Sequence, residues 1–147
     1  MTSEAPPPPL LLVVGPTASG KTALAVALAS ALGGEVVSAD AMAVYRGLDI
    51  ATAKPTSAER ASVPHHGLDL VDPHERCDVA RWLAAAETAI AAVQARGRQP
   101  VVCGGSPLYL KSLLEGLSAG APRDAAVREG LHARYRADPA TLFAELQ

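Results

Sequence analysis

Apolar residues in the first part of the chain form two short runs with a helical stripe between them. Leu10–Val14 is an unbroken apolar run that stops at Gly15-Pro16, a pattern typical of a strand buried on both faces of a parallel sheet. Residues 21–32 predict a helix, because apolar residues recur at helical spacing before the stop signal of Gly33-Gly34. That stripe comprises Leu24, Ala27, Leu28, Ala31 and Leu32. Glu35–Ser38 then predicts a second short strand.

The middle of the chain is less regular until residue 79. Residues 41–66 mix Gly, Pro and Thr with few apolar anchors, which predicts a loop with short helical turns, and residues 68–71 predict a brief strand. One helical face then extends from residue 79 to the stop signal at Gly97. Its apolar residues are Val79, Trp82, Leu83, Ala86, Ile90 and Val93. The apolar residues 100–103 predict a further strand, which ends at Gly104-Gly105.

The last part of the chain is predicted to be helical. Ser106 suits a helix N-cap and Pro107 a first turn, so we expect a helix that ends near Glu115. After Gly116 an amphipathic helix is predicted, followed by a second candidate helix at residues 142–146. The amphipathic helix is marked by Val127, Leu131 and Tyr135. Strands and helices that alternate in this order predict a three-layer α/β fold with a mainly parallel sheet, followed by the start of a helical segment.

Composition narrows the class of protein. The chain has 147 residues, 49% of them hydrophobic and 19% charged, which fits one folded domain rather than a disordered chain. A net charge of -2 excludes a uniformly basic nucleic-acid coat, and 3% aromatic residues disfavour recognition by base stacking. Two cysteines are too few for a disulfide scaffold or a zinc site and fit a reducing compartment.

The strongest chemical signal joins the first predicted strand to the first predicted helix. The segment reads Gly15, Pro16, Thr17, Ala18, Ser19, Gly20, Lys21 and Thr22. This order satisfies G-x-x-x-x-G-K-[ST], in which glycines let backbone N–H groups point inward and the lysine and the helix N-terminus add positive charge. The Thr22 hydroxyl is suited to hold a magnesium ion. The motif predicts a P-loop that binds a di- or triphosphate group, without specifying ATP.

A P-loop alone leaves kinases, ATPases, GTPases and pyrophosphate-releasing transferases open. Asp40 directly follows the second predicted strand, and residues beyond the carboxyl ends of parallel strands surround the ligand. Asp40 is therefore a candidate base for a nucleophile, and a turn cap explains its position equally well. A typical ATPase carries an Asp after a strand such as residues 101–103, where this chain has Gly104-Gly105. This difference disfavours ATPases and motor proteins.

Four segments in order resemble the signatures of the tRNA dimethylallyltransferase family, also called tRNA isopentenyltransferases. They are residues 15–22, residues 38–55 (SADAMAVYRGLDIATAKP), residues 63–69 (VPHHGLD) and residues 104–109 (GGSPLY). The resemblance extends from about Leu10 to Arg128. It implies transfer of a dimethylallyl group from dimethylallyl diphosphate to N6 of the adenosine that lies 3′ of the anticodon in tRNA. Diphosphate is the leaving group, and Mg2+ is the implied cofactor.

The resemblance also implies roles for individual residues. Residues 15–22 would bind the diphosphate of the donor, with Lys21 and Thr22 stabilising charge on the leaving group and Thr22 holding Mg2+. Asp40 would take the proton of the exocyclic amine as general base. Contacts to tRNA are implied for Asp40, Ala41, Met42, Ala43, Ser106 and Arg128.

Several other positions carry expectations of their own. Ala43 stands where the family usually has Gln, and Ala51 and Pro107 stand where it usually has Gly. We expect these differences to weaken tRNA binding more than donor binding. His65-His66 are expected to form a structural turn rather than a metal site, and Lys54 is a candidate contact for RNA or phosphate.

Three regions are expected along the chain. Residues 1–9 predict a disordered proline-rich lead-in, residues 10–117 a P-loop α/β core, and residues 118–147 the start of a helical tRNA-binding region. Because family members are longer, the chain resembles their N-terminal half, and we expect it alone to bind diphosphate weakly and turn over poorly.

A cytoplasmic monomer without a membrane segment is expected. The alternatives are a P-loop small-molecule kinase, an adenylate prenyltransferase and an inactive truncated remnant.

Overall fold

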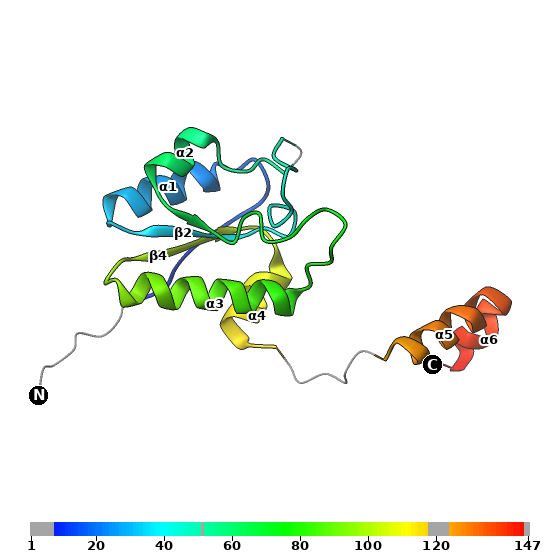
Figure 1. The fold of residues 1–147 in the computed structure, drawn as a ribbon. Helices are drawn as coiled ribbons and strands as arrows, with labels where there is room; N and C mark the ends of the chain where they lie inside the picture. The colour runs from blue at the N-terminus through cyan, green and yellow to red at the C-terminus, as the bar shows by residue number, and fades with distance from the viewer. Residues whose placement is uncertain (1–7, 51, 118–123, 146–147) are drawn as a thin grey trace, which may run out of the picture. The chain divides into compact units, whose positions relative to one another are not determined.

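The computed structural model describes residues 8–50, 52–117 and 124–145, which divide after Leu117 into two compact units. The first unit contains a parallel sheet in the order β1-β4-β2-β3 (Figure 1). Its strands are β1 (Leu11–Val14), β2 (Glu35–Ala39), β3 (His65–His66) and β4 (Pro100–Gly104). Its helices are α1 (Lys21–Ala31), α2 (Ser57–Ser62), α3 (Val79–Ala95) and α4 (Pro107–Glu115). The predicted α/β fold with a parallel sheet is confirmed.

The second unit consists of α5 (Ala125–Ala137) and α6 (Pro139–Glu145). Within it, Leu142 alone among the described residues is even partly buried. Parts of the predicted lead-in and of the predicted C-terminal region lie outside the described residues, as does Ala51. These parts are residues 1–7, 118–123 and 146–147.

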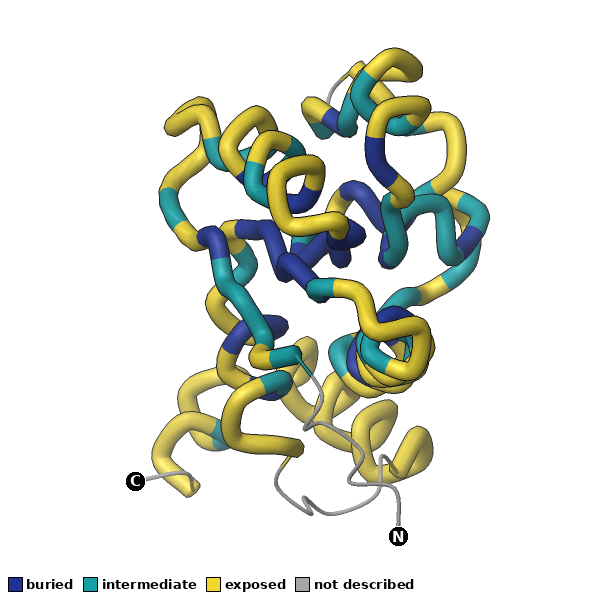
Figure 2. Tube along the Cα trace, turned by 90° about the vertical axis from the view of Figure 1, so that its left-hand side faces the viewer, coloured by how far each residue is buried: buried dark blue, intermediate teal, exposed yellow. Residues whose placement is uncertain are grey.

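The sheet of the first unit separates two apolar cores. Because side chains alternate along a strand, Val101 and Cys103 of β4 pack with α1, whereas Val102 packs with α3 and α4. Figure 1 shows α1 and α2 on one side of the sheet and α3 and α4 on the other. Figure 2 shows the buried residues gathered along the central strands, with the outward sides of the helices exposed. These positions form the three layers expected from the sequence.

The predicted buried face of α3 is confirmed, whereas the predicted buried face of α1 is wrong. Trp82 is fully buried, stacks on Tyr109 with a centroid distance of 4.2 Å and donates its indole N–H to the carbonyl of Ser38 at 2.9 Å. In α1, Ala25 and Ala29 are fully buried, whereas Leu24 is 54% exposed. The helix is apolar nearly all round, so periodicity could not select the face that lies on the sheet.

The strand predictions are partly corrected. The side chains of β1 contact both cores, because Leu12 packs against the core beside α3 and α4 while Leu11 and Val13 pack in the core beside α1. β1 pairs with β4 alone among the described strands, so it is an edge strand, and Val14 at its end is 56% exposed. The brief strand lies at residues 65–66 rather than 68–71. Gly67 and Asp69 adopt left-handed φ values of 74° and 54°, which end the extended backbone before residue 68.

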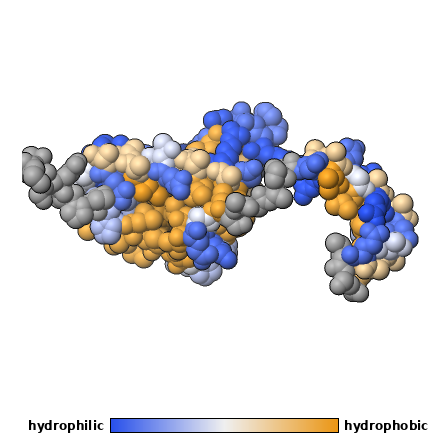
Figure 3. Space-filling view, turned by 90° about the horizontal axis from the view of Figure 1, so that it is seen from below, coloured by the Kyte–Doolittle hydropathy of each residue, from blue (hydrophilic) through white to orange (hydrophobic). Residues whose placement is uncertain are grey.

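Part of the apolar surface is open to solvent. Figure 3 looks onto the α3 and α4 side of the first unit and shows a broad apolar area. Leu108 and Leu114 of α4 are 61% and 64% exposed, and several alanines of α3 are exposed as well. None of the helices that the structure describes is long and apolar enough to cross a membrane.

A buried carboxylate joins the start of β2 to its neighbours. Glu35 is 3% exposed and accepts hydrogen bonds from His66 at 2.6 Å, Arg96 at 2.8 Å and Arg98 at 3.2 Å. Burial alone would raise the pKa of Glu35, but the hydrogen bonds from His66 and Arg96 outweigh burial and hold the pKa below its ordinary value of 4.5. The folded protein therefore favours the ionised carboxylate.

This lowered pKa predicts a stability loss in acid. The unfolded chain takes up a proton near pH 4.5, above the folded value, so the contribution of Glu35 is complete above that pH and is lost as pH falls through the folded pKa. We expect Glu35→Gln to lose about 1–3 kcal/mol at pH 7 and to be less acid-sensitive than the wild type. Urea unfolding at pH 7 and pH 4 measures both effects, with the exposed Glu87→Gln as control. Wild-type and Glu35→Gln stabilities that fall in parallel would contradict the expectation.

Candidate phosphate site and catalytic carboxylate

The loop between β1 and α1 adopts the curled form that its motif predicts. Ala18 and Gly20 have left-handed φ values of 62° and 81°, which turn the backbone into the helix. Gly20 is the N-cap of α1, so no side chain occupies the first N–H groups of the helix. The ammonium of Lys21 donates to the carbonyl of Pro16 at 2.6 Å, which holds it over the loop. Free helix N–H groups beside a lysine form an anion site.

The carboxyl ends of three strands meet at this loop. A Cβ on Gly105 would lie 3.0 Å from the carbonyl oxygen of Gly15, so the segment after β4 packs directly on the start of the P-loop. The Ser106 hydroxyl accepts a hydrogen bond from the N–H of Ala41 at 2.9 Å, and the Ser106 N–H donates to the carbonyl of Ala39. These contacts fasten the segment after β2 to the segment after β4.

Asp40 occupies a turn at the end of β2. Its Oδ1 accepts hydrogen bonds from the N–H groups of Met42 at 2.8 Å and Ala43 at 3.2 Å. Within the described residues its Oδ2 accepts no hydrogen bond. One carboxylate oxygen of Asp40 therefore caps the turn, while the other is available to accept a proton. Asp40 can thus be both a turn cap and a candidate base. The backbone bonds fix the orientation of the carboxylate.

A cavity of about 340 Å³ brings the P-loop and this carboxylate together. Its lining includes residues 17–22 on one side and Asp40, Ala43 and Gly104 beside them. The lining also includes residues 52–55 with Glu59 and His65. A volume in this range suits a small-molecule site. Of the residues predicted to act in catalysis, Lys21, Thr22 and Asp40 all line this one cavity.

Cys103, near the end of β4, lines the same cavity as Lys21 and Asp40. Burial raises the pKa of the Cys103 thiol, the charge of Lys21 lowers it and that of Asp40 raises it. The thiol stays protonated and supplies an uncharged wall.

The other predicted tRNA contacts are distributed over both units. Ala41 and Met42 are exposed beside Asp40, whereas Ala43 is buried and lines the cavity. Ser106 uses its hydroxyl to hold the turn at Ala41. Arg128 is exposed on α5 in the second unit. The roles of these residues toward tRNA stay predictions.

The interpretation of Lys54 as an RNA or phosphate contact is wrong. Lys54 is 8% exposed and forms ion pairs with Asp49 and Asp69, so its charge is already neutralised inside the protein. Sequence reasoning also missed that His65 lines the cavity. Burial lowers the pKa of His65 and keeps its ring neutral. The register of β3 against β2 places His65 there, and no local pattern reveals that register.

The cavity contains groups suited to a magnesium ion that arrives with phosphates. Mg2+ usually keeps several waters and takes only one or two protein oxygens, the rest coming from the substrate. The Thr22 hydroxyl in the first turn of α1 lines the cavity and fits such a site. The part of the chain that the structure describes has no cluster of three His, Cys, Asp or Glu side chains that would hold a metal alone.

A parallel sheet that carries a P-loop at the carboxyl end of its first strand defines a phosphate-binding α/β protein. Sequence comparison then specifies the family. The model of the family described as "IPP transferase" matches residues 43–147, and that described as "Isopentenyl transferase" matches residues 8–69. The chain belongs to the IPP transferase family.

Curated relatives named tRNA dimethylallyltransferase share much of this sequence. The protein of Anaeromyxobacter sp. (strain Fw109-5) is 62% identical over 122 residues, which are 83% of this chain and 41% of the relative. The protein of Sorangium cellulosum is 53% identical over 135 residues, which are 90% of this chain and 42% of the relative. The chain thus spans about two fifths of these relatives.

Solved structures with the same fold belong to the same group. The tRNA isopentenylpyrophosphate transferase of Bacillus halodurans is similar with a TM-score of 0.73 and 40% identity, over 92% of this chain and 49% of that chain. A eukaryotic dimethylallyltransferase acting on tRNA is similar with a TM-score of 0.72 and 28% identity, over 90% of this chain and 37% of that chain. These comparisons support the transferase interpretation and give no support to the kinase alternative.

Proposed function

We propose that this chain forms the donor-binding and proton-accepting part of a tRNA dimethylallyltransferase. The observation that carries the proposal is the shared cavity, in which the P-loop and Asp40 face one space at the carboxyl ends of the sheet. Its chemistry is transfer of a dimethylallyl group from dimethylallyl diphosphate to N6 of an adenosine in tRNA. Membership of the family and the names of the relatives support this reaction.

In this reaction a carbon–nitrogen bond forms between N6 and C1 of the donor, and the bond between C1 and the diphosphate oxygen breaks. The amide groups of residues 17–20, the start of α1 and the Lys21 ammonium stabilise the negative charge on the departing diphosphate. Asp40 takes the proton that N6 loses, and its turn holds the carboxylate in place before the substrates bind. The uncharged Ala43 and Cys103 beside it suit a prenyl group.

Magnesium is the proposed cofactor, which the Thr22 hydroxyl would hold together with oxygens of the donor diphosphate. When bound, it neutralises charge on the leaving group. We further propose that the adenosine lies in the anticodon loop, beside the turn of residues 40–43. The proposed setting is the cytoplasm, and the proposed state is a monomer.

The deciding experiment supplies the chain with labelled dimethylallyl diphosphate, Mg2+ and either tRNA or AMP. We expect slow formation of N6-prenyl adenosine in tRNA and none with AMP. Product with AMP would indicate an adenylate prenyltransferase, and ATP consumption with a small hydroxyl acceptor would indicate a kinase. Binding of inorganic pyrophosphate without transfer to either acceptor would leave only the phosphate site of the proposal standing.

A further inference from the structure

A buried lysine joins the loop of residues 45–54, part of which lines the cavity, to the loop at Asp69. The side chain of Lys54 is 1% exposed, and its ammonium donates to the carbonyl of Tyr45 at 2.5 Å, to Asp49 at 2.9 Å and to Asp69 at 2.7 Å. An ammonium has three donors, so every donor of Lys54 is used. Burial alone would lower the pKa of Lys54, but hydrogen bonds to Asp69 and Asp49 outweigh burial and raise it. Lys54 therefore stays charged.

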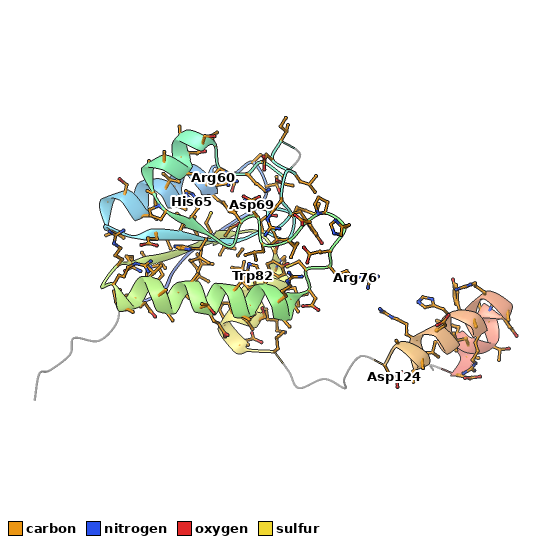
Figure 4. The ribbon with its side chains drawn as sticks, viewed as in Figure 1. Arg60, His65, Asp69, Arg76, Trp82 and Asp124 are labelled. Carbon is orange, nitrogen blue, oxygen red and sulfur yellow. The ribbon has the colours of Figure 1, made fainter. Side chains whose placement is uncertain are left out.

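Asp69 extends the network in two directions. Its Oδ2 accepts a hydrogen bond from Arg60 of α2 at 2.8 Å, and Figure 4 shows these two residues beside each other. Its backbone N–H donates to the carbonyl of Ala43 at 3.2 Å, next to the turn of Asp40. Asp69 also holds a left-handed φ of 54°, a strained conformation that persists only where its surroundings fix it. The network thus connects α2, Lys54 and the turn of Asp40.

The P-loop is anchored independently of this network. It is continuous with β1 and α1, and its lysine bonds to the carbonyl of Pro16. Residues 52–55 of the lining are held by Lys54 itself, whose backbone N–H also donates to the carbonyl of Asp49. The two sides of the cavity therefore depend on different contacts.

We propose that Lys54 is a positioning residue, which fixes the loop wall and the turn of Asp40 against the P-loop and so sets where the acceptor amine meets the donor. This inference rests on the proposed function, because it assigns the acceptor to that side of the cavity. Lys54 has no donor left for a ligand and acts through the loops. Loss of Lys54 therefore impairs transfer while donor binding persists.

The test compares Lys54→Met with Asp49→Asn, a milder variant because the Asp49 side chain is 65% exposed. Lys111→Met removes an exposed lysine on α4 and serves as the control. We expect the amides of Met42, Ala43 and Asp69 to exchange about tenfold faster in Lys54→Met, less so in Asp49→Asn, while amides of β4 keep their wild-type rates. Calorimetry should show an unchanged affinity for inorganic pyrophosphate. In transfer assays, kcat should fall at constant donor KM.

Other outcomes would overturn the inference. Wild-type exchange at Met42 and Ala43 in both variants would show that Lys54 does not hold the turn. Equal acceleration in β4 would show a loss of overall stability instead of a local role. A parallel fall in pyrophosphate affinity would show that the two sides of the cavity are not independent. If the wild-type chain transfers nothing, the proposed function fails, and exchange together with pyrophosphate binding still decides this inference.

Discussion

Asp40→Asn is expected to abolish prenyl transfer while leaving the fold intact. An asparagine Oδ1 can still accept the hydrogen bonds from Met42 and Ala43, so the turn should remain and stability should change by about 0.5 kcal/mol or less. The amide cannot take a proton from N6, so the single-turnover rate of transfer to tRNA should fall about 100- to 10,000-fold. Affinity for pyrophosphate should stay unchanged, because the P-loop is not altered.

Asp78→Asn is a matched control for this variant. Asp78 is an exposed aspartate that caps α3, and its Oδ1 accepts a hydrogen bond from the N–H of Arg81 at 3.0 Å. The control should transfer at the wild-type rate. If Asp40→Asn retained wild-type transfer, Asp40 would be a turn cap alone. If Asp40→Asn unfolded, circular dichroism would reveal the loss of structure. The carboxylate would then be required to stabilise the turn.

Lys21→Met is expected to weaken pyrophosphate binding about 10- to 100-fold, the effect of losing one hydrogen bond from a charged donor to an anion. Lys21 has only the carbonyl of Pro16 as a hydrogen-bond partner among the described residues, so its removal leaves no carboxylate unpaired. Stability should therefore change little. Titration calorimetry with pyrophosphate and Mg2+ measures the loss directly.

Lys111→Met on α4 removes a lysine whose side chain is 70% exposed and lies 3.7 Å from Glu115. It should bind pyrophosphate with wild-type affinity. Both titrations are repeated at higher salt, because salt screens long-range attraction between charges strongly and a direct contact between Lys21 and the anion only weakly. This comparison separates the two contributions to pyrophosphate affinity. Equal affinities of Lys21→Met and the wild type would place the anion outside the P-loop.

Sequence patterns predicted the structure correctly where neighbouring residues determine the backbone conformation. The P-loop, the strand before it and the helix after it depend on neighbouring residues, and all three were predicted within a residue or two. The buried face of α3 was also predicted, because its apolar and polar sides differ clearly. The position of Asp40 beside the P-loop followed from a general property of parallel sheets.

The predictions were wrong where contacts between residues far apart in the chain determine the structure. In α1 nearly every side is apolar, so only packing on the sheet selected Ala25 and Ala29. The place of β3 depends on its pairing with β2, which begins about thirty residues earlier. Lys54 was interpreted as a contact for RNA or phosphate because its burial between Asp49 and Asp69 depends on how two loops fold together, which sequence spacing does not reveal.

The sequence by itself determined the P-loop, the alternation of strands and helices and the candidate base, because these features arise from short-range spacing and from the fixed geometry of strand ends. Only the tertiary structure decided which helix face is buried, where the sheet ends and which charges neutralise one another. Those outcomes depend on contacts between residues far apart in the chain, and such contacts exist only after the loops have closed.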